Sequence, residues 1–379
     1  MFRRIIELKP IVERKSVFLF GPRQTGKSYY LRKTFPDAQY YDLLKTDLFF
    51  RLSSSPHLLR EELLVKRDNK LVIIDEVQKL PVLLDEVHAL IEEHDFRFIL
   101  TGSSARKLKY GSSNLLGGRA LTKRLFPLVT PEIPQYNLER ILNFGSLPSI
   151  YNSPFPLDDL EGYIGTYLKE EIHAEGLVRK LGHFSKFLNI AAFCNAEMLN
   201  FAGIGSDVGL PGKTISEYFR VLEDTLIGSL LQAYTKTTKR KAISTAKFYF
   251  FDVGVSNILA GRSNITPKTE LFGKAFEHFI FLELKAWVHY RGVRKALTYW
   301  RSKSGYEVDF LLGDDIAIEV KGTERVTDKH LKGLKALSED ISLKRKIVVS
   351  LDPKKRLNGD IEVFPYHDFL DALWGDDFL

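Results

Sequence analysis

The chain has 379 residues, of which 44% are hydrophobic and 27% charged, as is typical of a globular protein with two to four domains. No apolar run is as long as a membrane span and the first residues lack the apolar core of a signal peptide, so we expect a cytoplasmic protein with no membrane contact. The single cysteine, Cys194, excludes an internal disulfide and a cysteine zinc cluster, and the net charge of +7 suits a nucleic-acid partner without requiring one.

Residues 3–15 predict a short basic helix, and the apolar run 17–20 predicts the first strand. The next loop has the pattern G-x-x-x-x-G-K-S and ends at Lys27 and Ser28. Its glycines let backbone N–H groups turn toward a phosphate, Lys27 would reach the β- and γ-phosphates, and the Ser28 hydroxyl would hold Mg²⁺. A helix beginning near Tyr29 would add its positive end to this anion site. The predicted ATP-binding residues are Gly21, Pro22, Arg23, Gln24, Thr25, Gly26, Lys27, Ser28 and Tyr29.

A second apolar run, 71–74, ends in Asp75 and Glu76. A continuous apolar run is what a parallel strand buried on both faces requires. Asp75, at the carboxyl end of that strand, is placed to act as a magnesium carboxylate, and Glu76 is placed to polarise the attacking water. An Asp-Glu pair after an apolar run is common by chance, but its position about fifty residues after the G-K-S pattern makes it informative.

The run 96–104 predicts another strand, which ends near Thr101 and Ser103. Their hydroxyls are candidate sensors of the γ-phosphate, and a plain strand with a Gly-Ser turn is an equal alternative. Arg119 and Arg124 flank a probable edge strand. Either could act on the γ-phosphate in its own chain or in a neighbouring subunit, and a surface arginine is the alternative for each.

Strands alternating with helices over the first ~130 residues predict an α/β fold with a mostly parallel sheet. The helices are expected over 51–67 and 81–93, and a further strand over 38–44. Ligands of such sheets bind at the carboxyl ends of the strands, where these motifs lie.

Helical periodicity follows from about residue 157, and the stretch 201–231 reads as a helix-turn-helix whose second helix begins at a capping Thr214. No acidic residue interrupts 225–251, so a winged helix-turn-helix with a basic wing fits, and phosphate contact is its natural use. A protein-packing module is the alternative. The candidate DNA-binding residues are Lys213, Arg220, Lys239, Arg240 and Lys241.

The final region combines a strongly apolar helix over 271–290 with three strands. Asp309 lies in the second strand, and Glu319 and Lys321 lie in the third at a spacing of two, which puts them on one face. Carboxylates that hold Mg²⁺ beside a lysine are what metal-assisted phosphodiester hydrolysis needs, and Glu277 on the helix could complete the metal shell. The alternative is an ion-paired pair of strands in which Lys321 neutralises the acids.

The stretches GPRQTGKS, LVIIDEVQKLP and ILTGSS, with KAFEHFIFLELK and YWRSKSGYEVDFLL…IAIEVKG, resemble the AAA+-like ATPases of bacteria and archaea that carry a C-terminal DUF4143 domain. The resemblance implies an ATPase core, a winged-helix segment and a terminal domain similar to the PD-(D/E)xK nuclease fold. It implies Lys27, Ser28, Asp75 and Glu76 as nucleotide machinery. The nuclease-like residues that it implies are Glu277, Asp309, Glu319 and Lys321.

The sequence therefore predicts four parts. They are an ATPase core (1–130), a helical lid or linker (131–183), a winged helix-turn-helix (184–265) and a nuclease-like domain (266–379). We expect ATP and ADP as ligands with Mg²⁺ as cofactor, DNA as a partner, and a protein partner or an oligomer as further options. The alternative to a DNA-associated ATPase with nuclease activity is an ATP-driven regulatory switch whose later domains bind protein partners without cleaving DNA.

Overall fold

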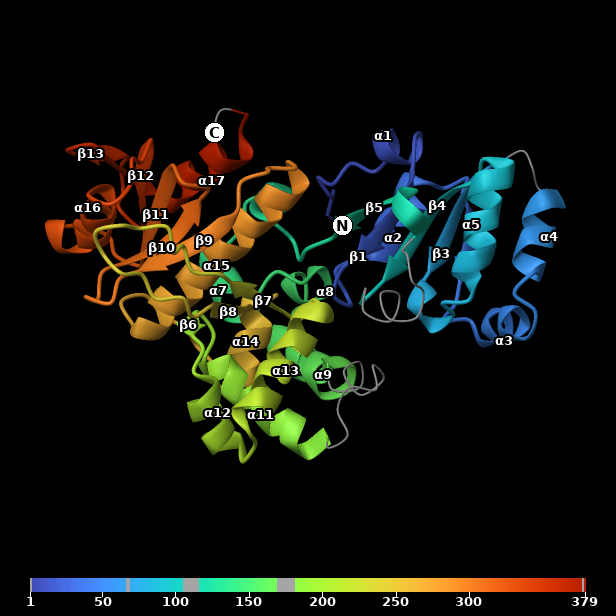
Figure 1. The fold of residues 1–379 in the computed structure, drawn as a ribbon, viewed down its shortest axis with the longest axis horizontal. Helices are drawn as coiled ribbons and strands as arrows, with labels where there is room; N and C mark the ends of the chain where they lie inside the picture. Colours follow the sequence, from blue (N-terminus) through green and yellow to red (C-terminus); the bar gives the residue numbers. More distant parts are fainter. Residues whose placement is uncertain (1, 66–68, 105–115, 169–180, 377) are drawn as a thin grey trace. The chain divides into compact units, whose positions relative to one another are not determined.

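The computed structural model describes residues 2–65, 69–104, 116–168, 181–376 and 378–379. The chain forms two compact units, Met1–Pro127 with Asp224–Ile227, and Leu128–Glu223 with Gly228–Leu379. The elements of each unit are labelled in Figure 1. Within the described ranges, no helix is both long and apolar enough to cross a membrane.

The first unit contains a five-stranded sheet in the order β2-β3-β4-β1-β5, in which all neighbours run parallel. Its strands are β1 (Ser16–Phe20), β2 (Gln39–Asp42), β3 (Leu71–Asp75), β4 (Arg97–Gly102) and β5 (Ala120–Arg124). Strands β1, β3 and β4 are almost wholly buried, which explains their uninterrupted apolar runs. The predicted parallel α/β core is confirmed.

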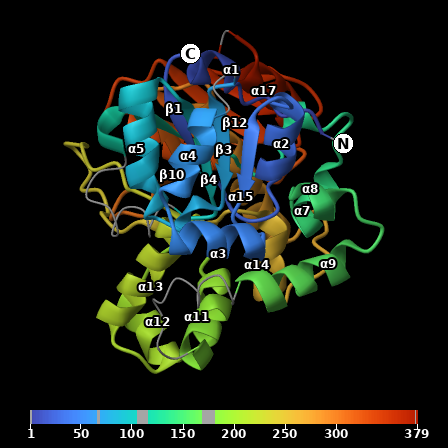
Figure 2. The ribbon, with the colours of Figure 1, turned by 90° about the vertical axis from the view of Figure 1, so that its right-hand side faces the viewer.

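Helices cover both faces of this sheet. They are α2 (Lys27–Thr34), α3 (Thr46–Ser54), α4 (Leu58–Val65) and α5 (Leu83–His94). The connection from β1 to β2 crosses the sheet in the opposite direction to the connection from β3 to β4, so right-handed crossovers put α2 and α5 on opposite faces. Figure 2 shows the strands between these two helices. Because β1, β3 and β4 run parallel, their carboxyl ends lie at the same edge of the sheet.

The amino-terminal helix is much shorter than predicted. Only α1 (Lys9–Val12) is helical, with Pro10 in its first turn. Proline lacks the N–H that would continue a helix from residues 3–8, so the helix can only begin there.

The second unit begins with helices and a small sheet. The helices are α7 (Leu138–Phe144), α8 (Pro148–Tyr151), α9 (Pro156–Gly162), a π-helical turn (Tyr163–Leu168), α11 (Leu181–Phe193), α12 (Phe201–Val208), α13 (Gly212–Asp224) and α14 (Val253–Leu259). The sheet is antiparallel in the order β6-β8-β7, from β6 (Glu197–Met198), β8 (Lys247–Phe250) and β7 (Gly228–Leu231). The two predicted helices of the helix-turn-helix are therefore present as α12 and α13. Thr214 is not a cap, however, because α13 already begins at Gly212.

The residues between β7 and β8 do not form a free-standing hairpin. Instead, its two ends pair with the region of β9 (Leu297–Arg301). Ala233 pairs with Tyr299 of β9, and Ala242 pairs with Ser302, the residue directly after β9. Tyr234 packs into the core of the last sheet. The segment 232–246 thus belongs structurally to the domain that follows it.

The last sheet has six strands in the order β13-β14-β12-β11-β10-β9. The remaining strands are β10 (Glu307–Leu312), β11 (Ile316–Lys321), β12 (Arg345–Ser350), β13 (Arg356–Asn358) and β14 (Ile361–Pro365). Adjacent residues of β10 point to opposite faces: Phe310 stacks on Phe281 of α15 (Glu270–Tyr290), and Leu311 packs into the core that contains α16 (Lys332–Ser338). Helix α17 (Tyr366–Trp374) follows β14. The predicted helix and three strands of this region are confirmed.

Candidate functional site

The phosphate-loop pattern forms a tight turn between β1 and α2. Gly26 caps α2 at φ 89°, in the left-handed region that glycine tolerates. The Lys27 side chain is buried inside the loop, and its Nζ donates to the carbonyl oxygens of Gly21 (2.7 Å) and Pro22 (3.1 Å). The ammonium is therefore held within the loop by backbone carbonyls, at the position from which the pattern predicts it to reach phosphates.

Two further contacts fix the shape of this loop. Arg4 donates to the carbonyl oxygens of Thr25 (2.7 Å) and Phe126 (2.6 Å), so it ties the loop to the chain that follows β5. A Cβ on Gly21 would lie 2.3 Å from the carbonyl oxygen of Leu125, so this position has no room for a side chain. Sequence reasoning missed Arg4, because nothing in a basic amino-terminal stretch marks one arginine as a loop contact.

Asp75 lies at the carboxyl end of β3 and is buried. Its carboxylate accepts hydrogen bonds from the hydroxyl groups of Thr101 on β4 and Tyr40 on β2. Burial and the hydrogen bond to Asp75 raise the pKa of Tyr40, while a hydrogen bond with Ser28 acts in the opposite direction. Tyr40 therefore connects Ser28 and Asp75, the two residues that the sequence predicts as magnesium ligands.

Glu76 follows directly and adopts φ 60°, an uncommon conformation for a residue that is not glycine. Its backbone N–H donates to Thr101 Oγ1 (3.1 Å), and its carboxylate accepts from Gln78 Nε2 (2.5 Å). The same Gln78 nitrogen lies 3.2 Å from Ser103 Oγ. Burial raises the pKa of Glu76, and Lys27 opposes this shift. Of the two sensor candidates, Thr101 thus contacts Asp75 and the Glu76 backbone, and Ser103 contacts the Gln78 side chain.

The two arginine candidates lie at opposite ends of β5. β5 runs parallel to β1 with Ser16 opposite Ala120 and Phe20 opposite Arg124, so Arg124 is level with the end of β1 that enters the phosphate loop. Arg119 lies before the other end, roughly 16 Å away along the strand, and pairs with Glu92 of α5. This position favours the alternative of a surface arginine over a role of Arg119 at the γ-phosphate of its own chain, and action on another subunit stays a prediction.

The residues around this loop fit a hydrated magnesium ion. Mg²⁺ prefers oxygen ligands and is usually held by one or two protein oxygens plus phosphates and waters. Ser28 and Asp75 supply a hydroxyl and a carboxylate that Tyr40 links directly. This donor set suits the ion.

The C-terminal candidates form a second cluster, in which β10 and β11 bring three side chains together. Lys321 Nζ lies 2.6 Å from Glu319 Oε1 and 3.8 Å from Asp309 Oδ2, and the N–H of Val320 donates to Asp309 Oδ2 (2.8 Å). Burial and Asp309 raise the pKa of Glu319 to about 8. Burial lowers the pKa of Lys321, but Asp309 and Glu319 outweigh that effect and the pKa is raised. The predicted grouping of these residues on one face is what the structure contains.

Glu277 joins this cluster from α15 through a lysine that the sequence did not single out for it. Lys247 Nζ lies 3.1 Å from Glu277 Oε1 and 2.6 Å from Glu307 Oε1, and the Tyr249 hydroxyl donates to Glu277 (2.6 Å). Burial raises the pKa of Glu277, while the Lys247 ammonium opposes this shift. Lys247 lies in the stretch 225–251 without acidic residues from which the sequence predicts a basic wing, but its side chain is only 4% exposed.

A divalent cation does not fit this cluster as the structure has it. Three of its carboxylates, those of Glu277, Glu307 and Glu319, already pair with lysines. Within the described ranges, no group of three or more histidine, cysteine, aspartate or glutamate residues is arranged to hold a metal ion.

The DNA-binding candidates fall into two groups. Lys213 and Arg220 are exposed and seven residues apart on α13, so they share one face. Arg240 contacts Glu339 (2.5 Å) and Asp340 (3.2 Å), the latter fully buried. The backbone N–H groups of Lys239 and Arg240 also donate to Asp340 (2.7 and 3.0 Å). These bonds hold this part of segment 232–246 against Asp340, and Lys241 is the next residue along the chain.

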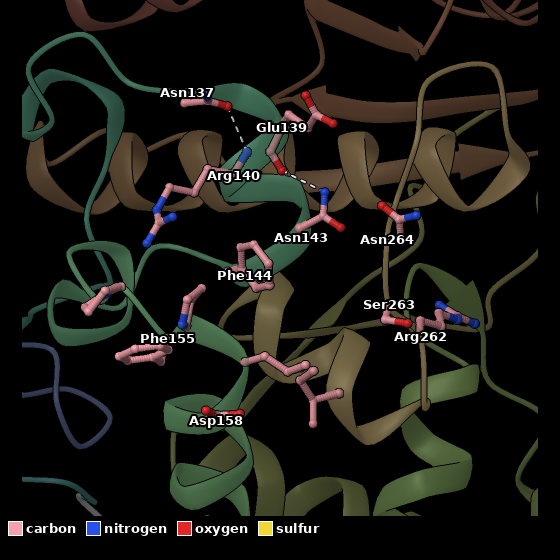
Figure 3. Close-up of a pocket in the computed structure, with 14 residues that line it drawn as sticks. Asn137, Glu139, Arg140, Asn143, Phe144, Phe155, Asp158, Arg262, Ser263 and Asn264 are labelled. Carbon is pink, nitrogen blue, oxygen red and sulfur yellow. Dashed lines mark hydrogen bonds between the residues drawn. The ribbon is translucent and has the colours of Figure 1, made fainter.

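A cavity of about 600 Å³ lies against α7 and includes none of the predicted site residues. Figure 3 shows two hydrogen bonds between polar side chains and the backbone of residues that line the cavity: the Asn137 side chain accepts from the Arg140 N–H, and the Asn143 side chain donates to the Glu139 carbonyl oxygen. The Arg140 guanidinium donates to the carbonyl oxygens of Tyr151 and Ser153. These groups stabilise the cavity walls.

Three family models match the chain. Residues 13–133 match an AAA domain, residues 272–369 match the domain of unknown function DUF4143, and residues 135–266 match the domain of unknown function DUF8612. The order AAA domain before DUF4143 is the one that the sequence motifs predict.

Two proteins of similar sequence match over long stretches. An uncharacterized protein of Methanocaldococcus jannaschii is 23% identical over 97% of this chain and 90% of its own length. An uncharacterized protein of Haemophilus influenzae is 24% identical over 60% of each chain.

Solved structures match more weakly. The replication initiator DnaA bound to AMPPCP and single-stranded DNA is 15% identical, over 57% of this chain and 86% of its own, with a TM-score of 0.29. A STAND protein with a tetratricopeptide repeat sensor from Pyrococcus horikoshii is 14% identical, over 77% of this chain and 49% of its own, with a TM-score of 0.24.

Proposed function

Because the chain belongs to the AAA+-like ATPases with a C-terminal DUF4143 domain, we propose that it binds ATP at residues 21–29 and hydrolyses it. The observation that carries the proposal is the arrangement at the carboxyl edge of the parallel sheet. There, Asp75 and the Glu76 backbone are hydrogen-bonded to Thr101 of β4, and the buried Lys27 is close enough to oppose the rise in the pKa of Glu76. Ligands of such sheets bind at this edge.

Each residue of the network has a role in this proposal. The loop N–H groups and the Lys27 ammonium bind the phosphates, and Lys27 exchanges its two loop carbonyls for phosphate oxygens. Ser28 and Asp75 would hold Mg²⁺, whose positive charge would offset the charge of the phosphates. Glu76 orients and polarises the attacking water, and Gln78 holds the Glu76 carboxylate in place.

The test compares two variants of this network. Glu76→Gln keeps the shape of the side chain but removes the base, so ATP affinity stays within about threefold and turnover falls by roughly 10²-fold or more. Lys27→Ala loses ATP affinity itself. Glu86→Gln on α5, away from the loop, serves as the matched control. Hydrolysis by Glu76→Gln at the wild-type rate would refute the assignment of the base.

Contact with DNA is the second part of the proposal. It is supported by the exposed pair Lys213 and Arg220 on the second helix of the helix-turn-helix. Neutralising both should reduce the slope of binding against salt by about two phosphate contacts. The control neutralises Lys239 and Lys241 instead. A salt slope unchanged by the α13 substitutions would remove this helix from the DNA proposal, and the regulatory-switch alternative with a protein partner would take its place.

For the C-terminal domain, binding without cleavage is the form of the proposal that the geometry supports. The lysines that contact Glu277 and Glu319 occupy the carboxylates on which a metal-dependent nuclease would depend. Incubation of supercoiled plasmid with Mg²⁺ or Mn²⁺, with and without ATP, tests this. Cleavage that disappears in Asp309→Ala, Lys321→Ala would replace the proposal with an ATP-coupled nuclease.

A further inference from the structure

Lys247 is buried among the carboxylates of the C-terminal cluster, although it comes from β8, outside residues 272–369 that match DUF4143. Its ammonium contacts Glu277 (3.1 Å) and Glu307 (2.6 Å), which lie on two different elements, α15 and β10. A charged group buried to this extent is stable only when it is paired. Lys247 is paired on both sides.

The position of Lys247 is set by the backbone around it. β8 is the central strand of its sheet, and Lys247 is opposite Met198 of β6 on one side and Leu231 of β7 on the other. The ring of Tyr299 lies 5.3 Å from the ammonium. The ammonium cannot leave the cluster by a simple change of rotamer into solvent, because its side chain is 4% exposed and its strand is paired along both edges.

Most of the charge of the cluster is offset within the protein. Its acidic members are Glu277, Glu307, Asp309 and Glu319, and its cations are Lys247, Lys321 and Arg301. A divalent cation would have to enter among carboxylates that already pair with these cations, and it would add two positive charges to them.

We propose that the Lys247 ammonium takes the place of a divalent cation in this cluster, so that the cluster binds neither Mg²⁺ nor Mn²⁺ while Lys247 lies there. A lysine ammonium is a compact point charge that can contact two carboxylates, as a cation would. Removing that charge leaves Glu277 without a cation and Glu307 with Arg301 alone, and it opens the oxygens that Lys247 contacted to a metal. The proposal concerns a different site from ATP hydrolysis and does not depend on it.

The experiment titrates the full-length protein with Mn²⁺ in the absence of nucleotide and follows free Mn²⁺ by electron paramagnetic resonance. All proteins carry Asp75→Asn, so that the phosphate-loop region adds no site. The background protein is expected to bind no Mn²⁺ with a Kd below about 1 mM, and Lys247→Met to bind one equivalent at least tenfold more tightly. Adding Glu277→Gln to Lys247→Met restores the charge balance and should abolish the new site.

Two controls separate this effect from general damage. Lys295→Met removes a different ion pair, in which Lys295 Nζ lies 2.9 Å from Asp315 Oδ2, just before β11. This variant should bind no Mn²⁺. Circular dichroism establishes that each variant folds, and Lys247→Gln replaces Lys247→Met if the latter does not. Lys247→Met should also melt at a higher temperature with Mn²⁺ than without it, whereas the background protein should not.

Either of two results would overturn the proposal. One is a Mn²⁺ site in the background protein that disappears in Asp309→Asn. The other is a folded Lys247→Met or Lys247→Gln protein that binds no Mn²⁺. Failure of ATP hydrolysis would leave these measurements unaffected, so the two proposals fail independently.

Discussion

The hydroxyl group of Tyr40 donates a hydrogen bond to the carboxylate of Asp75, so a side chain of β2 reaches the acidic residue at the end of β3. The same hydroxyl is hydrogen-bonded to Ser28, the first residue after the phosphate-loop lysine. A magnesium ion bound here would therefore compete with Tyr40 for the Asp75 carboxylate.

We expect Tyr40→Phe to strengthen magnesium-linked nucleotide binding. Loss of one hydrogen bond worth about 1 kcal/mol corresponds to roughly fivefold in affinity. The measurement is the Kd of a fluorescent ATP analogue in Mg²⁺ and in EDTA, where the ratio of the two should increase about fivefold. Tyr41→Phe is the control, because Tyr41 follows on the same strand and bonds to Glu62 instead. An unchanged or smaller ratio in Tyr40→Phe would mean that Tyr40 positions Asp75 for the metal.

Gln78→Met should slow hydrolysis without weakening ATP binding. The Gln78 amide donates to the Glu76 carboxylate, and a hydrogen bond to a charged group is worth about 1.5–3 kcal/mol, so kcat should fall about tenfold or more. Steady-state hydrolysis and equilibrium binding are measured together. Gln39→Met removes an amide on the same sheet that donates to the Asn69 backbone, and it is expected to behave like wild type. A parallel loss of ATP affinity would instead indicate that the loop has collapsed.

Gly21→Ala should destabilise the first unit and abolish nucleotide binding. The added Cβ would meet a backbone carbonyl oxygen at 2.3 Å, and overpacking of this kind costs roughly 1–3 kcal/mol. Thermal unfolding and ATP affinity are the measurements. Gly273→Ala provides the contrast, since a Cβ there meets no atom within 4 Å and alanine favours the helix. Normal ATP affinity in Gly21→Ala would contradict the tight loop described above.

Stability should fall as pH rises from about 5 to 7, in part because of Glu283. Burial raises the pKa of Glu283 from 4.5 to about 7, despite hydrogen bonds from Trp374 and Thr130. In this window the folded protein keeps a proton that the unfolded chain releases, so the free energy of unfolding decreases with pH and levels off above about 7, a total of at most roughly 3 kcal/mol.

Glu283→Gln cannot ionise, so its melting temperature should lack this contribution. The quantity to measure is the melting temperature of wild type minus that of the variant at pH 5, 6, 7 and 8, which should decrease as pH rises because only wild type loses stability. Glu139→Gln, an exposed glutamate on α7, should give a constant difference. A Glu283→Gln difference that does not vary with pH would mean that Glu283 is ionised throughout.

Arg240→Met should lower stability without changing affinity for DNA. Arg240 contacts Glu339 and Asp340 and lies over the Tyr306 ring, so its charge is already used within the protein. Thermal melting should decrease, while Lys239→Met, the exposed neighbour, should melt like wild type. A loss of DNA affinity in Arg240→Met that is larger than the loss in Lys239→Met would contradict this prediction. It would mean that Arg240 leaves Glu339 and Asp340 to contact DNA phosphates.

The parts of the site that could be predicted are those encoded in contiguous residues. Gly21 to Ser28 and the Asp75-Glu76 pair each carry their own local pattern, and the carboxyl ends of parallel strands must meet, so their proximity follows from the fold class alone. The spacing of Glu319 and Lys321 likewise fixes a shared face from the strand period.

The parts that could not be predicted depend on contacts between distant residues. Tyr40 and Asp75 are 35 residues apart and Lys247 and Glu277 are 30 apart, and neither pair has a sequence pattern. A lysine in a stretch without acids looks solvated, and only the pairing of β8 with β6 and β7 shows that Lys247 is buried. The sequence could not distinguish Arg119 from Arg124, because only the parallel pairing of β5 with β1 puts Arg124 at the phosphate-loop end of the strand and Arg119 at the other.

The pairing of segment 232–246 with β9 also protects the protein from self-association. β9 is an edge strand of the last sheet, and backbone groups of Gln232, Tyr234, Lys241 and Ile243 bond along its open side. An uncovered edge strand is a template for pairing with another chain. A fragment cut at the predicted boundary, residue 266, would expose β9 and would lose Lys247 as well, so it should aggregate, whereas one that begins before β7 keeps the edge covered.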